Sequence, residues 1–323
     1  MSIPWLETEQ KALNAALEAD RFGHAPLLYG PGGIGKRAFS HWLVARILCQ
    51  AEQGQRPCGT CRSCLLLQAG THPDLFLAGV AEEKTQITVD QVRKLCAGLQ
   101  LTPSIGDQRV GLIEPAERMN ANAANALLKT LEEPSSRAWL ILVSDRAELL
   151  PATVRSRCQK LALHPPRRPE ALRWLQSESG TASPDDLNMA LDFSGDAPLR
   201  AREIIEQGGL SRGRAIREVL LDVAGGAPLS ASVAEQWAAH PQESWDWISH
   251  WIRQWMIGEF GVASGSGHEE LPVAGRRDHL AAELARSWKR AQESRKLADT
   301  AIRADLLLGK WLLEWQGIFA RDR

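Results

Sequence analysis

Residues 27–37 read Leu27-Leu28-Tyr29-Gly30-Pro31-Gly32-Gly33-Ile34-Gly35-Lys36-Arg37. An apolar run typical of a buried strand enters a glycine-rich loop, and a helical pattern follows the loop. This order matches the phosphate-binding loop G-x-x-x-x-G-K-[ST], in which backbone N–H groups and a lysine hold a polyphosphate at a helix N-terminus. The candidate nucleotide-binding residues are therefore Gly30, Gly32, Gly33, Gly35 and Lys36. The last position departs from the motif, because Arg37 stands where a Ser or Thr hydroxyl would bind Mg²⁺.

The composition indicates a globular chain of more than one domain. A chain of 323 residues is longer than an ordinary domain with one hydrophobic core, so two or three domains are expected. A net charge of −1 argues against a protein dominated by nonspecific DNA affinity. No run of about 18 apolar residues occurs, and residues 1–5 carry no basic-then-apolar signal. We therefore expect a cytoplasmic protein with no membrane contact.

Four of the six cysteines follow the helix that leaves the loop, with the spacing C-x8-C-x2-C-x2-C. They are Cys49, Cys58, Cys61 and Cys64. Four thiolates can complete a tetrahedron around Zn²⁺ and leave no open position, so the spacing predicts a structural zinc module over residues 49–64. A redox pair or free thiols are the alternatives. Cys96 and Cys158 lie in apolar patterns and are expected to be core residues.

Strands alternate with helices up to residue 164, which predicts a doubly wound α/β domain with a parallel sheet. Thr88 and Gln91 have the spacing of a capping box and predict a helix start. The apolar stretch 109–113 predicts a buried strand that ends in Glu114-Pro115. In phosphate-loop ATPases the equivalent strand ends in two acids, the first supporting Mg²⁺ and the second polarising the attacking water. Pro115 cannot act as that base, so a second catalytic feature is missing.

The basic turn at residues 154–158 includes Ser156 and Arg157. One interpretation is a solvated basic turn. The other is an arginine finger, because a guanidinium at a subunit edge can reach the ATP of a neighbouring subunit and neutralise charge on the γ-phosphate. The sequence composition alone favours the first interpretation.

Breaks in the pattern predict three domains. The proline- and arginine-rich segment 164–169 and the pair Gly208-Gly209 interrupt the periodic sequence. We therefore expect a phosphate-loop domain over 1–165, a small helical domain over 166–207 and a helical C-terminal domain over 208–323. The tryptophan-rich helices of the last domain are expected to be mainly core, and a surplus would suit packing against other subunits.

Two motifs carry a family resemblance. Residues 125–134 read N-A-L-L-K-T-L-E-E-P, and residues 156–158 read S-R-C. Both resemble the clamp-loader branch of the AAA+ ATPases, as does a cysteine module at this place in the chain. The resemblance covers roughly residues 1–205 and implies an AAA+ type doubly wound parallel sheet with an embedded zinc module, a small helical lid and an all-α collar. It also implies that Arg157, with Ser156, forms an arginine finger that acts in trans.

The two missing features make the chain resemble a subunit of the bacterial DNA polymerase III clamp loader that does not hydrolyse ATP. The resemblance implies a hetero-oligomeric ring with gamma/tau and delta subunits, which meets primed DNA and the sliding clamp through the complex. No intrinsic ATPase activity is expected. The glycine set and Lys36 leave nucleotide binding without turnover as an open alternative.

Two other functions compete with this interpretation. The chain could be an active ATPase in which Glu114 supports Mg²⁺. It could also be a direct DNA-binding protein, although the near-neutral charge and the absence of a basic-aromatic stripe disfavour that role.

Overall fold

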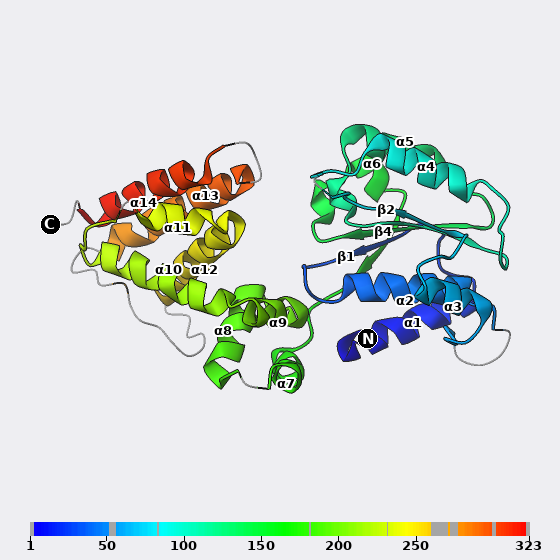
Figure 1. Cartoon of the computed structure of the whole chain (residues 1–323), viewed down its shortest axis with the longest axis horizontal. Helices are drawn as coiled ribbons and strands as arrows, with labels where there is room; N and C mark the ends of the chain where they lie inside the picture. Colours follow the sequence, from blue (N-terminus) through cyan, green and yellow to red (C-terminus); the bar gives the residue numbers. More distant parts are fainter. Residues whose placement is uncertain are drawn as a thin grey trace. The chain divides into compact units, whose positions relative to one another are not determined.

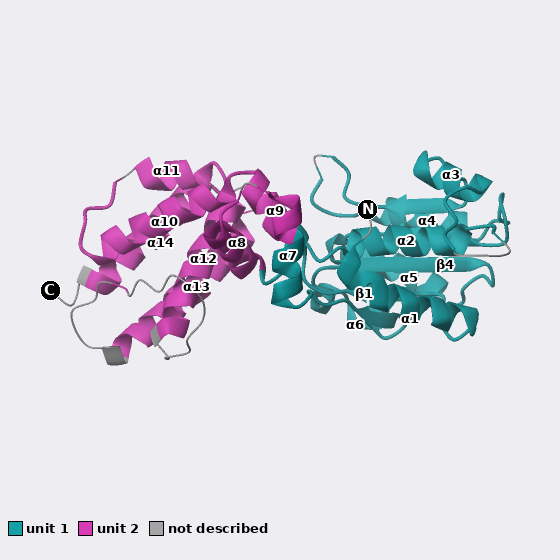
Figure 2. Cartoon of the chain, turned by 90° about the horizontal axis from the view of Figure 1, so that it is seen from below, with its two compact units in different colours: residues 1–174, 195–200 teal, residues 175–194, 201–323 magenta. Residues whose placement is uncertain are grey.

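The computed structural model describes residues 3–51, 56–82, 84–180, 182–230, 232–259, 271, 277–298 and 302–320. The chain forms two compact units, shown in different colours in Figure 2. Unit 1 comprises residues 1–174 and 195–200, and unit 2 comprises residues 175–194 and 201–323. The predicted lid over 166–207 and collar over 208–323 stay predictions.

Unit 1 is built on a five-stranded parallel sheet with the order β2-β3-β4-β1-β5. Its strands are β1 (Pro26–Tyr29), β2 (Leu75–Ala78), β3 (Arg109–Ile113), β4 (Ala138–Ser144) and β5 (Gln159–Ala162). The central strands β1, β3 and β4 are almost wholly buried, as their continuous apolar sequences predict for a sheet covered on both faces. The predicted parallel α/β fold is confirmed.

Helices cover both faces of this sheet (Figure 1). They are α1 (Glu7–Glu18), α2 (Lys36–Leu48), α3 (Arg62–Gln68), α4 (Val89–Leu99), α5 (Ala121–Glu132) and α6 (Ala152–Arg155). One core layer includes Leu43 of α2 with Ile141 of β4, and the other includes Leu95 of α4 with Leu127 of α5. Three short 3-10 helices span Pro4–Leu6, Ala116–Arg118 and Ala147–Leu149.

Two helices cross the division between the units, namely α7 (Arg168–Glu178) and α9 (Pro198–Glu206). Unit 2 is otherwise helical in its described part. It contains α8 (Pro184–Ser194), α10 (Gly209–Ala224), α11 (Ser232–Ala238), α12 (Pro241–Glu259), α13 (Arg277–Leu297) and α14 (Ala304–Ala320). In the described part of the chain, no helix combines the length and apolarity that crossing a bilayer requires.

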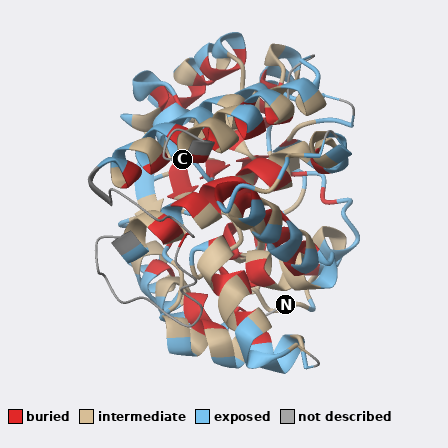
Figure 3. Cartoon of the chain, turned by 90° about the vertical axis from the view of Figure 1, so that its left-hand side faces the viewer, coloured by how far each residue is buried: buried red, intermediate tan, exposed pale blue. Residues whose placement is uncertain are grey.

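Tryptophan side chains form much of the unit 2 core. Trp245, Trp247 and Trp315 are fully buried. Trp247 stacks on Phe193 with 3.7 Å between ring centroids, and Gly213 of α10 makes room for its indole ring. Figure 3 shows the buried stretches in red, alternating with exposed ones along the helices.

The C-terminal helices, which the sequence predicts to be mainly core, are buried only in part in α13 and α14. Leu284, Ala291 and Trp311 are in the core, but Trp288 keeps 36% of its surface and Leu306 keeps 61%. Helical periodicity identifies one side of a helix, whereas burial of each residue on that side depends on how far the neighbouring helix extends. The two exposed side chains therefore correct the predicted core.

Candidate functional site

The five predicted nucleotide-binding residues lie in the loop between β1 and α2 and at the first position of α2. Lys36 is the first residue of α2, and its side chain is only 4% exposed. Its Nζ donates to the Gly30 carbonyl at 2.7 Å and to the Pro31 carbonyl. The same Nζ lies 2.6 Å from Oδ1 of Asp145, a residue that directly follows β4. The lysine of the loop is thus held by groups of the protein itself.

The glycines of the loop allow other parts of unit 1 to approach closely. Gly33 has φ of +79°, which disfavours a side chain, and a methyl group there would overlap Cβ of Arg200. The Leu199 N–H also donates to the Gly33 carbonyl at 3.1 Å. A methyl group on Gly32 would lie 2.9 Å from Oδ2 of Asp145. The loop therefore packs against its own chain on at least two sides.

The end of β3 lacks the second acid of a hydrolysing site. Glu114 follows β3 and is half-buried, with Pro115 after it. Burial raises the pKa of Glu114, the positive charge of Arg37 opposes that rise, and the carboxylate of Asp145 adds to it. Glu114 thus has Arg37 nearby, but the position of the water-polarising base is occupied by a proline.

Arg157 lies just after α6 and remains at the surface, with 37% of its side chain exposed. Its Nε and Nη2 donate to Oε1 of Glu132 at 2.8 and 2.6 Å, and its Nη1 donates to the Thr153 carbonyl at 3.0 Å. Ser156 is exposed and its hydroxyl also donates to the Thr153 carbonyl, at 3.2 Å. The guanidinium is therefore ordered but not folded into the core of unit 1.

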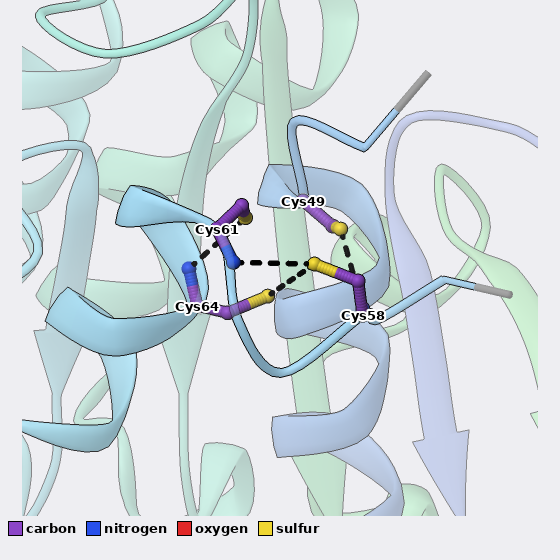
Figure 4. Close-up of side chains that lie close together, drawn as sticks. All are labelled: Cys49, Cys58, Cys61 and Cys64. Atoms are coloured by element: carbon purple, nitrogen blue, oxygen red, sulfur yellow. Dashed lines mark hydrogen bonds between the residues drawn. The ribbon is translucent and has the colours of Figure 1, made fainter. Parts of the chain in front are cut away.

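The four predicted zinc ligands converge on one point, as Figure 4 shows. Cys49 follows the last residue of α2, Cys61 caps the N-terminus of α3, and Cys64 lies in the first turn of α3. Their sulfur atoms, with that of Cys58, all lie within 4.8 Å of one another, and the Cys58 and Cys64 sulfurs are 4.0 Å apart. Zn–S bonds of about 2.3 Å in a tetrahedron place sulfur atoms about 3.8 Å apart. The cluster therefore fits a structural zinc ion.

Backbone N–H groups of the turn donate hydrogen bonds to the cysteine sulfurs, which favours the thiolate form that a metal binds. The N–H groups of Cys58, Cys61 and Cys64 point at the sulfurs of Cys49, Cys58 and Cys61, at 3.4, 3.3 and 3.5 Å. Hydrogen bonds from Thr60 and Cys61 lower the pKa of Cys58 to about 6, while burial raises the pKa of Cys64 to about 12. Metal ligation requires thiolates, so a bound cation would displace the proton of Cys64.

A buried hydrogen-bond chain, which the sequence did not reveal, ties the cysteine cluster to β2. The Asp74 N–H donates to Nδ1 of His72 at 3.1 Å, so the neutral ring carries its proton on Nε2. Nε2 then donates to the Ser63 hydroxyl at 2.9 Å, and that hydroxyl donates to the Leu48 carbonyl at 2.7 Å. Burial lowers the pKa of His72, and the Asp74 charge opposes that shift. The chain connects α3 to the end of α2, next to Cys49.

The carboxylate of Asp74 extends the same network toward α4. It accepts the N–H groups of Ser104 and Ile105 at 2.8 and 2.7 Å and pairs with Nη2 of Arg109 at 3.3 Å. Arg109 is buried and also donates to the Gly98 carbonyl at 2.6 Å. The sequence signal was the His-Pro-Asp triplet before β2, where polar residues directly precede a strand.

Cys96 and Cys158 lie outside the cluster and pack against the unit 1 core, as predicted. Burial raises the pKa of Cys158 to about 11. Ser144, the last residue of β4, is fully buried, and its Oγ accepts the Arg146 N–H at 3.2 Å.

The order of the sheet, with β1 between β4 and β5 and the phosphate loop leaving β1, places the chain in the AAA+ class of α/β proteins. A family model described as DNA polymerase III, delta subunit, matches residues 6–167. DNA polymerase III subunit delta' of Pseudomonas aeruginosa is 34% identical over 98% of this chain and 97% of its own length. The chain belongs to this family of DNA polymerase III delta' subunits of the clamp loader.

Two further proteins are similar to this chain. DNA polymerase III subunit delta' of Escherichia coli is 40% identical over 63% of this chain and 60% of its own length. Among solved structures, a DNA polymerase III gamma subunit-related protein from Thermotoga maritima aligns over 99% of this chain and all of its own, at 16% identity and a TM-score of 0.43.

Proposed function

We propose that this chain is a clamp-loader subunit that does not hydrolyse ATP and that supplies Arg157 to the ATP site of a neighbouring gamma/tau subunit. In this role it supports loading of the sliding clamp onto primed DNA during replication. This chain would contribute the guanidinium of Arg157 to the reaction and would act as a scaffold for the subunit ring. The observation that carries the proposal is the contrast between an exposed Arg157 and a phosphate loop whose Lys36 is paired with Asp145.

The site around the loop supports the absence of hydrolysis. Mg²⁺ in such sites is held by a Ser or Thr hydroxyl after the lysine and by an acid at the end of the third strand. Here a cationic side chain, Arg37, replaces the hydroxyl, and Pro115 replaces the acid that would polarise water. Glu114 remains, but its pKa is raised by burial, which disfavours the charged form that Mg²⁺ needs.

The surroundings of Arg157 support a role toward a partner. Glu132 binds the guanidinium through Nε and Nη2, which leaves N–H groups on the opposite edge directed away from that pair. Phosphate groups bind arginine through two parallel N–H groups of this kind. A neighbouring γ-phosphate would therefore meet Nη2 together with Nη1, whose contacts with the Thr153 carbonyl and the Ser156 hydroxyl it would replace, while the contact with Glu132 stays.

Zinc and the ring partners complete the proposal. Cys49, Cys58, Cys61 and Cys64 would hold one structural Zn²⁺, which would fix the end of α2 against the start of α3. Residues 166–207 would act as the lid, and residues 208–323 would form the collar that joins gamma/tau and delta subunits in a hetero-oligomeric ring. Contact with DNA and with the clamp would be made through this complex.

The test is ATP turnover by the assembled loader containing Arg157→Ala. Loss of an arginine finger lowers turnover by about 10³–10⁵ in well-studied phosphoryl transfers. A matched control is Arg155→Ala, which removes the other arginine of the same turn. Clamp loading at the wild-type rate by an intact complex with Arg157→Ala would refute the finger. Turnover of Mg-ATP by the isolated wild-type chain would refute the non-hydrolysing role.

A further inference from the structure

The carboxylate of Asp145 occupies the place where a phosphate contacts the loop lysine. In phosphate loops the lysine reaches the β- and γ-phosphates of the bound nucleotide. Here Nζ of Lys36 has Oδ1 of Asp145 at 2.6 Å and two carbonyl acceptors, Gly30 and Pro31. Lys36 is nearly inaccessible to solvent, so these three acceptors account for its three N–H donors.

The other oxygen of the same carboxylate lies against the loop backbone. Oδ2 of Asp145 would be 2.9 Å from a methyl group placed on Gly32. Phosphate loops carry glycines so that bound phosphates can approach the backbone closely. Asp145 thus pairs with the loop lysine and occupies the space that the missing side chain of Gly32 leaves open.

The fold holds Asp145 in this position. Strands β1 and β4 are neighbours in the sheet, with Tyr29 in register with Ser144, so the residue after β4 lies beside the start of the loop. The Asp145 N–H donates to Oε1 of Glu117 at 3.2 Å, which orients the backbone of this residue. The sheet order therefore brings the backbone of Asp145 beside the loop, and its half-exposed side chain reaches Lys36 from there.

The charges around the loop disfavour a further anion. Two cations, Lys36 and Arg37, and two carboxylates, Glu117 and Asp145, lie close enough together to act on the ionisation of Glu114. A triphosphate would enter a site in which carboxylates already balance the cations. Like charges placed together weaken binding, so the carboxylates at this loop disfavour a polyphosphate ligand.

We propose that Asp145 is an internal substitute for nucleotide phosphate, which keeps the loop closed to polyphosphates, and that removing its charge converts the loop into a binding site for the triphosphate group. The inference rests on the proposed non-hydrolysing role, since it explains how that loop is kept without nucleotide.

The test measures binding of tripolyphosphate and, separately, of ATP to the full chain by isothermal titration calorimetry. The variants are Asp145→Ala and Asp145→Asn, and the matched control is Glu148→Gln, which removes an exposed acid three residues away. We expect the two Asp145 variants to bind tripolyphosphate at least about tenfold more tightly than the wild type. The control should behave as the wild type. Adding Lys36→Met to Asp145→Ala should abolish the gain.

Folding of each variant is checked by circular dichroism and by the thermal midpoint. The inference is overturned if wild-type chain binds tripolyphosphate as tightly as Asp145→Ala, or if a folded Asp145→Ala chain binds neither probe. A gain that persists with Lys36→Met would also overturn it, because the site would then lie elsewhere. None of these results bears on Arg157, whose role is tested by turnover in the assembled complex.

Discussion

His250 is a buried imidazole in α12 whose protonation should destabilise unit 2 at low pH. It is 6% exposed and lies among aromatic rings, with centroid distances of 5.5 Å to Phe193 and 4.9 Å to Trp251. Burial, with a smaller effect of the Arg253 charge, lowers the pKa of His250 to about 3 from 6.5. The folded protein therefore keeps this ring neutral at pH values where an unfolded chain would protonate it.

The sign and size of the effect follow from these two values. Well above pH 6.5 the ring is neutral in both states, and this contribution to stability is fully present. As the pH falls toward 3, the unfolded chain gains a proton that the folded chain does not, so stability is lost across that window. Between about pH 7.5 and about pH 5 the loss amounts to about 2 kcal/mol.

The assay is urea denaturation followed by tryptophan fluorescence, which reports mainly on unit 2 because most of the tryptophans lie there. His250→Leu should remove this part of the pH dependence at little cost near neutral pH, because Nδ1 of His250 has no hydrogen-bond partner in the described part of the chain. His279→Gln, at an exposed histidine of α13, should keep the wild-type dependence. Equal shifts of the urea midpoint in wild type and His250→Leu would refute the reasoning.

Two further outcomes are expected for unit 1. The purified chain should carry about one zinc ion, measured by elemental analysis. Cys58→Ser should lose this zinc, whereas Cys158→Ser, which changes a cysteine outside the cluster, should keep it. A Cys58→Ser chain that still carries one zinc ion would show that Cys58 is not a ligand. Asp74→Ala should lower the free energy of unfolding by about 3–5 kcal/mol, because it leaves Arg109 buried and unpaired. Asp107→Ala, at an exposed acid of the nearby loop, should cost less than about 0.5 kcal/mol, and similar losses in both variants would show that the buried pair contributes little.

Local signals were sufficient for much of unit 1. The spacing of Thr88 and Gln91 predicted a capping box, and both of its hydrogen bonds are present. The strand predicted over 109–113 has those bounds, because the uncharged run of residues 110–113 before Glu114-Pro115 fits a central parallel strand. The cysteine spacing predicted the convergence of four thiols, because three of them lie within seven residues and Cys49 lies at the end of the helix before them.

Contacts between distant residues could not be predicted in the same way. Lys36 follows β1 and Asp145 follows β4, so β2 and β3 lie between them in the sequence. They meet only because β4 lies beside β1 in the sheet. The network of Ser63, His72 and Asp74 likewise depends on the packing of α3 near the start of β2. The hydrophobic periodicity of the sequence does not indicate that packing. Exposed Trp288 shows the same limit in unit 2, because its burial depends on a neighbouring helix.

The return of residues 195–200 to unit 1 determines where the chain can be shortened. The Leu199 N–H of this segment donates a hydrogen bond to the Gly33 carbonyl of the phosphate loop. The segment directly follows α8, which belongs to unit 2. A recombinant fragment stopping at residue 174 would leave the loop backbone without that cover. Expression boundaries for the N-terminal part therefore belong beyond residue 200, with α8 included, and not at the first apparent linker.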